Sequence, residues 1–443
     1  MPLRRSESRS PALVAELARA AQPLEDDASL DPILDRVGDA HVVLLGEASH
    51  GTSDFYTWRD RLSRRLIREK GFSFIAVEGD WPDCQRVDHW VKGDGEERAV
   101  DVLHAFARWP TWMWANREVA ALAEWLREWN DELPHARRVG FHGLDVYSLW
   151  DSMREVTEYL GALDPELARQ ARSAYRCFDP YFDDAQEYAR ATALVPTSCE
   201  EEAIAVLQRM QAKAAALRTS GKDDFFDAEQ NALVARNAER YYRTMVRGGP
   251  SSWNVRDHHM CETLERLIGH YGNGAKAIVW EHNTHVGDAR FTDMASHGMV
   301  NVGQLARQQY GEEEVAIVGF GSYQGTVIAG DEWGAPMRRM RVPEARAGSV
   351  EALLHEAGGG ADRLLVFDGS DDGGVRGLDA PLAHRAIGVV YDPHFERFGN
   401  YVPTRLARRY DAFIHVDRSR ALDALHLETR EDGEVLETFP SGM

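Results

Sequence analysis

A histidine and a carboxylate share a short segment bounded by glycines. Residues 46–52 read Gly-Glu-Ala-Ser-His-Gly-Thr, which places Glu47 and His50 in one tight turn. A histidine titrates near neutral pH, and a neighbouring carboxylate fixes its tautomer and raises its basicity. The pair is therefore suited to remove a proton from water. An acid at this position can also serve only to cap a following helix, and that structural alternative stays open.

A second segment combines two histidines with an acid and an asparagine. Residues 281–285 read Glu-His-Asn-Thr-His and follow the apolar run 277–280. A single histidine is most often a structural residue, but two so close together at the end of a strand strengthen the case for a functional site. We therefore count His282, Asn283 and His285 as candidate site residues.

Ester hydrolysis is a reaction that such groups support. It needs a nucleophile, a base and a donor that stabilises the oxyanion. The sequence contains no Gly-x-Ser-x-Gly elbow, and no cysteine lies in a recognisable nucleophile motif. Water activated by His50 is then the expected nucleophile, without a covalent intermediate. An arginine or a protonated histidine would meet the oxyanion.

The same acids and histidines leave two other functions open. All of them are competent ligands for zinc or manganese, although the sequence lacks a His-Glu-x-x-His motif. We assign no metal ligand and expect no cofactor, with metal-dependent hydrolysis as the alternative. A small-molecule binding protein without turnover is the other alternative.

Composition argues against several classes of protein. The chain has 443 residues and a formal net charge of −21, which disfavours binding to nucleic acid. It contains no run of about 18 apolar residues and no signal-peptide core, so we expect neither a membrane span nor secretion. The four cysteines have no zinc or redox spacing and are too few for a disulfide framework. These features predict a cytoplasmic protein that acts on a small molecule.

Short apolar runs recur along the chain, and each ends at a polar or charged residue. Continuous runs of this kind are typical of strands buried on both faces, and the helical patterns between them predict βαβ units. The runs that precede Glu47, Glu78 and Asp145 are 42–45, 74–77 and 139–144. The later runs are 277–280, 315–320, 364–367, 387–391 and 413–416. Ligands of open α/β sheets bind outside the carboxyl ends of the strands, so these ends are the expected site.

The sequence thus predicts an α/β protein with a mostly parallel central sheet flanked by helices. A helical N-terminal segment spans residues 1–40, and residues 41–149 form the first half of the core. Residues 150–250 are rich in Ala, Arg, Glu and Gln without a strand pattern, which predicts a helical lid insertion. Residues 251–443 complete the core.

Several segments together resemble the erythromycin esterase family, although none is specific alone. They occur in order between residues 40 and 330, and include Leu45-Gly-Glu-Ala-Ser-His-Gly51, Val77-Glu-Gly-Asp80, Gly143-Leu-Asp-Val-Tyr-Ser-Leu149, Asn254-Val-Arg-Asp257 and Trp280-Glu-His-Asn-Thr-His-Val-Gly-Asp288. Glu281 departs from the pattern, because a small residue is expected there. This departure is the one hint in favour of the alternative without turnover.

The resemblance implies an α/β core with a helical lid, and an esterase that opens the lactone of a macrolide such as erythromycin. His50 is then the expected general base. Glu47 and Glu78 are expected to orient the base or the water, and His285 belongs to the same catalytic set. The substrate carbonyl or its developing charge is expected to be bound by Arg59, Arg256, His282 and Asn283.

Overall fold

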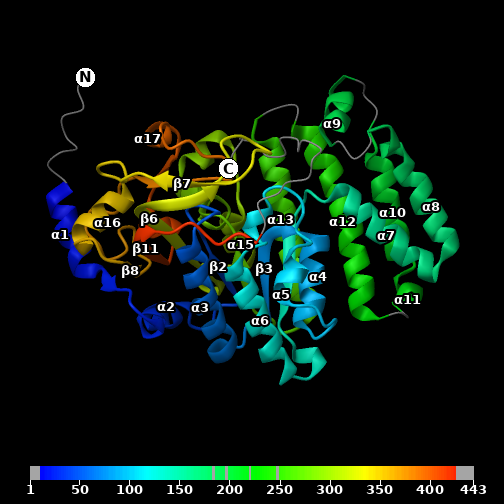
Figure 1. Ribbon diagram of the computed structural model, residues 1–443, viewed down its shortest axis with the longest axis horizontal. Coiled ribbons are helices and arrows are strands. Elements are labelled where there is room, and N and C mark those ends of the chain that lie inside the picture. Colours follow the sequence, from blue (N-terminus) through cyan, green and yellow to red (C-terminus); the bar gives the residue numbers. More distant parts are fainter. Residues whose placement is uncertain (1–9, 182–184, 195–197, 219–220, 246–248, 426–443) are drawn as a thin grey trace.

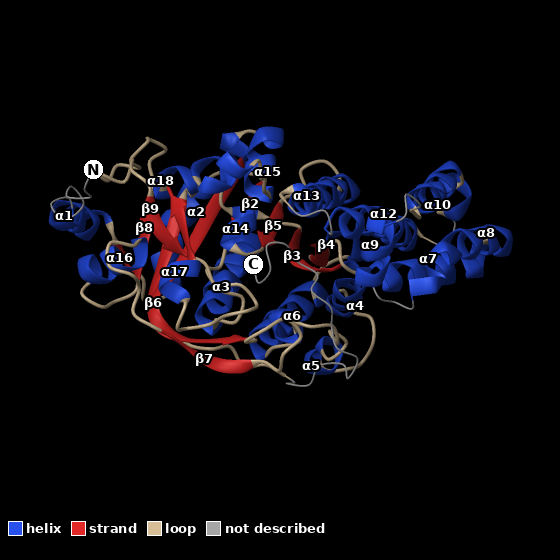
Figure 2. Ribbon diagram, turned by 90° about the horizontal axis from the view of Figure 1, so that it is seen from above, coloured by secondary structure: helices blue, strands red, loops and turns tan. Residues whose placement is uncertain are grey.

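The apolar runs form a parallel sheet at the centre of the molecule (Figures 1 and 2). The computed structural model describes residues 10–181, 185–194, 198–218, 221–245 and 249–425. Its parallel strands are β2 (Val42–Leu45), β3 (Phe74–Asp80), β4 (Gly140–Asp145), β5 (Ala277–Trp280), β6 (Val315–Ala329) and β11 (Ala412–Ser419). They lie in the order β11-β6-β2-β5-β3-β4, each parallel to its neighbours. The predicted fold class is confirmed.

The sheet departs from the prediction at its other edge. Strand β8 (Arg363–Val366) runs antiparallel to β11, and β1 (Gln22–Pro23) pairs antiparallel with β8. The run 387–391 forms only isolated bridges, with Ser49 and Gly330. Strand β6 continues well past the predicted run 315–320, and its second half pairs with β7 (Arg338–Val342) in an arm that curves away from the sheet (Figure 2).

Helices cover both faces of the sheet because successive strand residues point to opposite sides. In β2, Val43 and Leu45 face a core shared with α2 (Asp31–Val37), α3 (Ser53–Lys70), α5 (Ala99–Leu103) and α6 (Arg117–Asp131). Val42 and Leu44 face the opposite core, which is shared with α1 (Ser10–Ala20), α13 (Ser251–Tyr271), α15 (Val302–Tyr310), α16 (Val350–Gly358) and α18 (Leu406–Arg409). Helix α4 (Trp81–Val91) packs against β4. The strands β9 (Leu382–Arg385) and β10 (Tyr401–Thr404) form a separate small sheet, and α17 (Glu396–Gly399) precedes β10.

The described part of 150–250 is a group of helices at one end of the molecule (Figure 1). It comprises α7 (Leu149–Leu163), α8 (Pro165–Tyr175), α9 (Ala185–Leu194), α10 (Glu200–Ala212), α11 (Ala214–Leu217) and α12 (Lys222–Met245). Phe178, Leu207 and Tyr241 belong to an apolar core of its own. Helix α12 joins it to the rest of the protein by packing against α13 and α4. No helix in the described ranges is long and apolar enough to span a bilayer.

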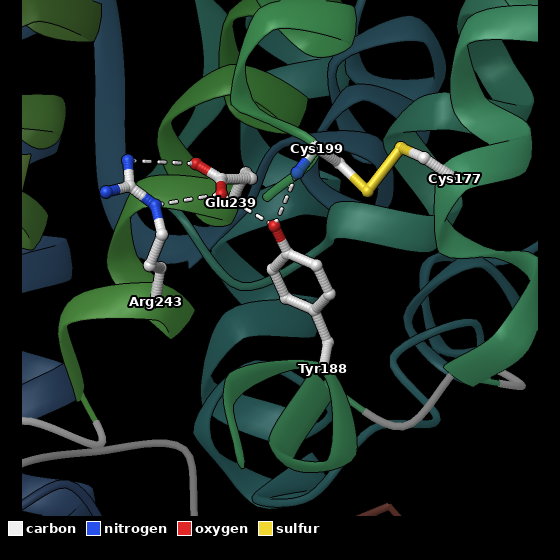
Figure 3. Close-up of a disulfide and its surroundings, with 5 residues drawn as sticks. All are labelled: Cys177, Tyr188, Cys199, Glu239 and Arg243. Carbon is white, nitrogen blue, oxygen red and sulfur yellow. Dashed lines mark hydrogen bonds and ion pairs between the residues drawn. A yellow bond between two sulfur atoms is a disulfide. The ribbon is translucent and has the colours of Figure 1, made fainter. Parts of the chain in front are cut away.

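A disulfide joins Cys177 to Cys199 in this helical group (Figure 3). Beside it, the hydroxyl of Tyr188 accepts from the backbone N–H of Cys199 (2.9 Å) and donates to Glu239 (2.6 Å). Cys84 and Cys261 are free and buried. The cysteine count predicted no disulfide framework, and this disulfide is one that the sequence did not predict.

Candidate active site

The carboxyl ends of four neighbouring parallel strands bring the candidate residues together. Strands β2, β5, β3 and β4 lie side by side, so their ends meet at one edge of the sheet. Glu47 follows β2, Glu78 lies in β3 close to its end at Asp80, Asp145 ends β4, and Glu281 follows β5. All four acids are at least 95% buried. Such burial is costly for a carboxylate without a partner, so the partners of these acids define what the site can do.

Two glycines allow the turn after β2 to fold tightly against its neighbours. A Cβ atom on Gly46 would lie 2.1 Å from Oδ1 of Asn283, and one on Gly51 would lie 1.9 Å from the carbonyl oxygen of Ile328. The backbone of Gly51 accepts hydrogen bonds from Ile328 and Leu422. This packing fixes the turn, and with it the position of His50.

Glu47 links His50 to an arginine behind it. Its Oε1 lies 2.9 Å from Nδ1 of His50, and its Oε2 accepts a 2.7 Å hydrogen bond from Nη2 of Arg59. The guanidinium of Arg59 is fully buried over the rings of Tyr56 and Trp280. Arg59 does not line the cavity described below, so it holds Glu47 rather than a ligand.

Arg256, on α13, connects the acids near the ends of β3 and β4. Its Nε and Nη2 donate to the two carboxylate oxygens of Asp145 at 2.9 and 2.6 Å. Its Nη2 also donates to Oε1 of Glu78 at 2.7 Å, and its Nη1 lies 3.1 Å from Nε2 of His285. A guanidinium has five N–H groups, so one N–H on Nη1 is left over from these contacts.

His285, on α14 (Asn283–Val286), is held on three sides. Its Nδ1 lies 3.0 Å from Oδ1 of Asp257, and its ring stacks on Trp253 with centroids 4.4 Å apart. Its Nε2 lies against Arg256, as above, and 3.5 Å from Oε1 of Glu78. Both ring nitrogens of His285 therefore have partners in the cluster, and neither is left to act as a base.

His282 and Asn283 are buried beside this cluster but do not line its cavity. The backbone N–H of His282 donates to Oε2 of Glu78, and its Nδ1 lies 2.8 Å from the hydroxyl of Thr284. The amide of Asn283 donates to the carbonyl oxygen of Phe320 at 2.7 Å. In this structure both residues hold the backbone around the site, so direct contact with a substrate stays a prediction.

A cavity of about 70 Å³ lies in front of His50, Glu78, Asp145 and Arg256. Its wall also includes residues that the sequence argument did not single out for the site: Asp80, Asp83, Arg108 and Tyr147. Asp145 and Asp80 follow the same rule of strand ends that identified Glu47 and Glu78, so that signal was available. Arg108, which pairs with Asp80, lies in a loop without a recognisable pattern.

The cover of the cavity comes from a different segment than expected. We expected a lid from residues 150–250, but no described residue of that range lines the cavity. Its apolar wall is built by Phe106, Trp109 and Trp114 together with Trp333, which follows the β6 arm. The rings of Trp109 and Trp333 lie 4.6 Å apart and close this side. Of the three tryptophans at positions 109, 112 and 114, Trp109 and Trp114 therefore belong to the cavity wall.

Electrostatics separate the roles of His50 and His282. Burial on its own lowers the pKa of His50, but the charge of Glu78 and then the contact with Glu47 raise this pKa above its ordinary value of 6.5. Burial, followed by the nearby His50, lowers the pKa of His282 well below the same value. Burial also opposes ionisation of Glu78, yet His285, Arg256 and His50 around it keep its pKa well below normal. The site therefore combines a strengthened base with a firmly ionised acid.

The nitrogen and oxygen atoms of this cluster do not form a metal site. Within the described ranges no group of three or more His, Cys, Asp and Glu side chains is placed to hold a metal ion. The guanidinium of Arg256 already lies between Glu78 and Asp145. His285 has both ring nitrogens engaged, as described above. These residues do not fit a bound cation in this arrangement.

Comparison with known proteins identifies the family. A family model described as Erythromycin esterase matches residues 67–419. The chain belongs to the erythromycin esterase family. The Escherichia coli protein named erythromycin esterase type II is 22% identical over 418 residues, covering 89% of this chain and 93% of that protein. The Bacillus subtilis putative hydrolase YbfO is 20% identical over 348 residues, covering 74% of this chain and 73% of its own.

Solved structures of related proteins show the same fold. A succinoglycan biosynthesis protein has a TM-score of 0.77 at 19% identity, covering 95% of this chain and 100% of its own. A mutant of the erythromycin esterase EreC in its open conformation has a TM-score of 0.67 at 19% identity, covering 93% and 98%. At this identity the likeness establishes the fold of this family member, and family membership indicates an esterase-like hydrolase.

Proposed function

We propose that the protein hydrolyses a carboxylic ester with water as the nucleophile and His50 as the general base. The observation that carries the proposal is the Glu47–His50 pair at the wall of a cavity that Arg256 also lines. Nδ1 of His50 is in hydrogen-bond contact with Glu47, so Nε2 is the ring nitrogen left to face a water molecule. The raised pKa of His50 makes it a stronger base than free imidazole.

The reaction follows from these positions. Nε2 of His50 takes a proton from water while the water oxygen forms a bond to the ester carbonyl carbon. The carbonyl oxygen becomes an oxyanion, and the spare N–H of Arg256 donates to it. Collapse of the tetrahedral intermediate breaks the bond between the carbonyl carbon and the alkoxy oxygen. The proton on His50 then passes to the departing alkoxide, so that base and site return to their initial state.

As substrate we propose a lactone of the macrolide type. The supports are family membership and the relative named erythromycin esterase type II. The cavity of about 70 Å³ is well below the roughly 300–1,000 Å³ typical of pockets for drug-sized ligands. A macrolide would therefore enter only when the wall formed by Trp109 and Trp333 moves apart.

The direct test is hydrolysis of a panel of macrolides and simple esters, followed by mass spectrometry of the products. We expect a mass gain of one water on at least one lactone. His50→Ala should lower the rate by about 10²–10⁴-fold, the typical contribution of a general base. His394→Ala is the matched control, because its side chain is 91% exposed. Equal rates for wild type and His50→Ala would contradict the proposal and favour binding without catalysis by this residue.

Two further measurements separate the mechanism from its alternatives. Intact-protein mass spectrometry after rapid quenching should show no acyl adduct, because no side chain is the nucleophile. Activity should also survive exhaustive chelation with substoichiometric residual metal. Loss of activity on chelation and its return with zinc or manganese would establish the metal-dependent alternative instead.

A further inference from the structure

A basic groove lies on the helical group, outside the site described above. It has a volume of about 630 Å³ and is lined by residues of α7, α8 and the turn after α8. These helices form the end of the molecule away from α16 (Figure 1). Its lining contains four arginines and one acid, Asp179: the arginines are Arg154, Arg169, Arg172 and Arg176. On a chain with a net charge of −21, this concentration of positive charge stands out.

Two of the arginines have no carboxylate partner among the described residues. Arg154 pairs with Asp151, and Arg169 pairs with Glu166. Among the described residues no ion pair involves Arg172 or Arg176, and Arg176 donates only to the hydroxyl of Ser173 at 3.2 Å. Arg172 and Arg176 are four positions apart, a spacing that places helical side chains on the same side, and both line the groove.

Two residues that bear hydroxyl groups, Thr157 and Ser173, also line the groove beside the arginines.

The helix dipole does not account for the whole arrangement. Arginines near the end of α8 are stabilised by the partial negative charge at that end of the helix. This effect explains the positions of Arg172 and Arg176 only. Arg154 and Thr157, however, belong to α7 and face the same groove. Guanidinium forks and hydroxyls together match the oxygen atoms of phosphate and carboxylate groups.

We propose that this groove binds a small molecule that carries two or more phosphate or carboxylate groups. The volume lies within the roughly 300–1,000 Å³ typical of small-molecule sites. The guanidinium groups of Arg172 and Arg176, which have no ion pair among the described residues, hold the anionic groups. The groove is a separate site, since it shares no lining residue with the cavity at His50.

The test is isothermal titration calorimetry of the full chain with pyrophosphate and, separately, with citrate at about 0.15 M salt, where weak exposed charge interactions are screened. We expect saturable 1:1 binding of at least one probe, and the stronger of the two identifies the anionic group. Arg172→Ala with Arg176→Ala should weaken binding at least about tenfold. Tyr175→Phe should leave binding unchanged, because the hydroxyl of Tyr175 is buried away from the groove. Arg209→Ala, an exposed arginine of α10 outside the groove, should leave binding unchanged.

The outcomes are decisive because the substituted arginines are exposed and do not support the core. Absence of saturable binding for both probes would overturn the proposal. Equal affinity of the wild type and the double arginine variant would also overturn it, by showing that any binding occurs elsewhere. Ester hydrolysis should be unaffected in all three variants, so failure of this proposal is distinguishable from failure of the catalytic one.

Discussion

The Nδ1 atom of His50 lies 2.9 Å from Oε1 of Glu47, and both residues belong to the turn between β2 and α3. Base and orienting acid therefore come from one local segment whose shape two glycines allow. Arg59, on the helix α3 that follows this turn, donates a 2.7 Å hydrogen bond to the other carboxylate oxygen. The oxyanion donor and the apolar wall come from other segments, Arg256 from α13 and Trp109 from the loop before α6.

The pH dependence of hydrolysis should report on His50. Its pKa is raised above 6.5, because Glu78 and Glu47 outweigh the effect of burial. A general base works only when it is neutral, so kcat/KM should fall as the pH drops through a value above 6.5. The measurement is a pH–rate profile with a simple ester between pH 5 and 9.

Glu47→Gln provides the matching variant for that profile. It removes the charge and the carboxylate contact that raise the pKa of His50, so the acidic limb should move to lower pH. Glu124→Gln, at an exposed position on α6, is the control and should leave the limb in place. An unchanged limb in Glu47→Gln would show that another group titrates.

Arg256→Lys should impair catalysis more than binding. Lysine keeps a positive charge but loses the paired donors to Asp145 and the contact with Glu78. Removing an oxyanion donor typically lowers kcat by about 10²–10³-fold, and we expect a decrease of that order with a smaller change in KM. Arg240→Lys, at an exposed position on α12, controls for the substitution itself. A variant with normal kcat would remove Arg256 from the mechanism.

The sequence predicted the parts of the site that follow a local rule. Glu47, Glu78 and Asp145 each follow an apolar strand, and parallel strands bring such ends together. The contacts within the cluster could not be predicted from the sequence, because they depend on how α13 packs against the sheet. Arg256 reaches Asp145 and Glu78 across more than 100 residues of chain, and Asp257 reaches His285 from the same helix. Spacing alone contains no signal for these pairs.

The cover of the cavity in the described residues comes from a segment that the sequence did not single out as a lid, for a related reason. A long helical insertion at residues 150–250 suggested a lid, but its apolar side chains are used for a core of their own. The wall instead comes from the loop at 106–114, whose tryptophans the sequence assigns to core or lid packing in preference to a cavity wall. Only the contact between Trp109 and Trp333 decides between these two interpretations.

Trp333→Ala should therefore widen the range of esters that are hydrolysed. The indole of Trp333 closes the cavity against Trp109, and its removal opens space toward solvent. We expect kcat/KM for a bulky naphthyl ester to rise by about tenfold relative to that for an acetate ester, because steric exclusion by a pocket wall is relieved. Trp129→Ala is the control, since Trp129 stacks on Trp125 outside the cavity. An unchanged ratio would show that the wall does not limit substrate size.

Glu281 should make the folded protein less stable as the pH rises. Burial, then the charges of Glu78 and Asp257, raise its pKa well above 4.5, and neither carboxyl oxygen has a partner among the described residues. Above pH 4.5 the folded state therefore holds a proton that the unfolded state has released, so the free energy of unfolding decreases by up to about 1.4 kcal/mol per pH unit until the folded pKa is reached. Glu281→Gln is neutral in both states and lacks this loss. The difference in Tm between Glu281→Gln and the wild type should thus increase in favour of the variant as the pH rises from 4.5 to 8. The two Tm values should converge toward pH 4. Parallel Tm curves across that range would mean that Glu281 is ionised in the folded protein and has a partner that this arrangement does not provide.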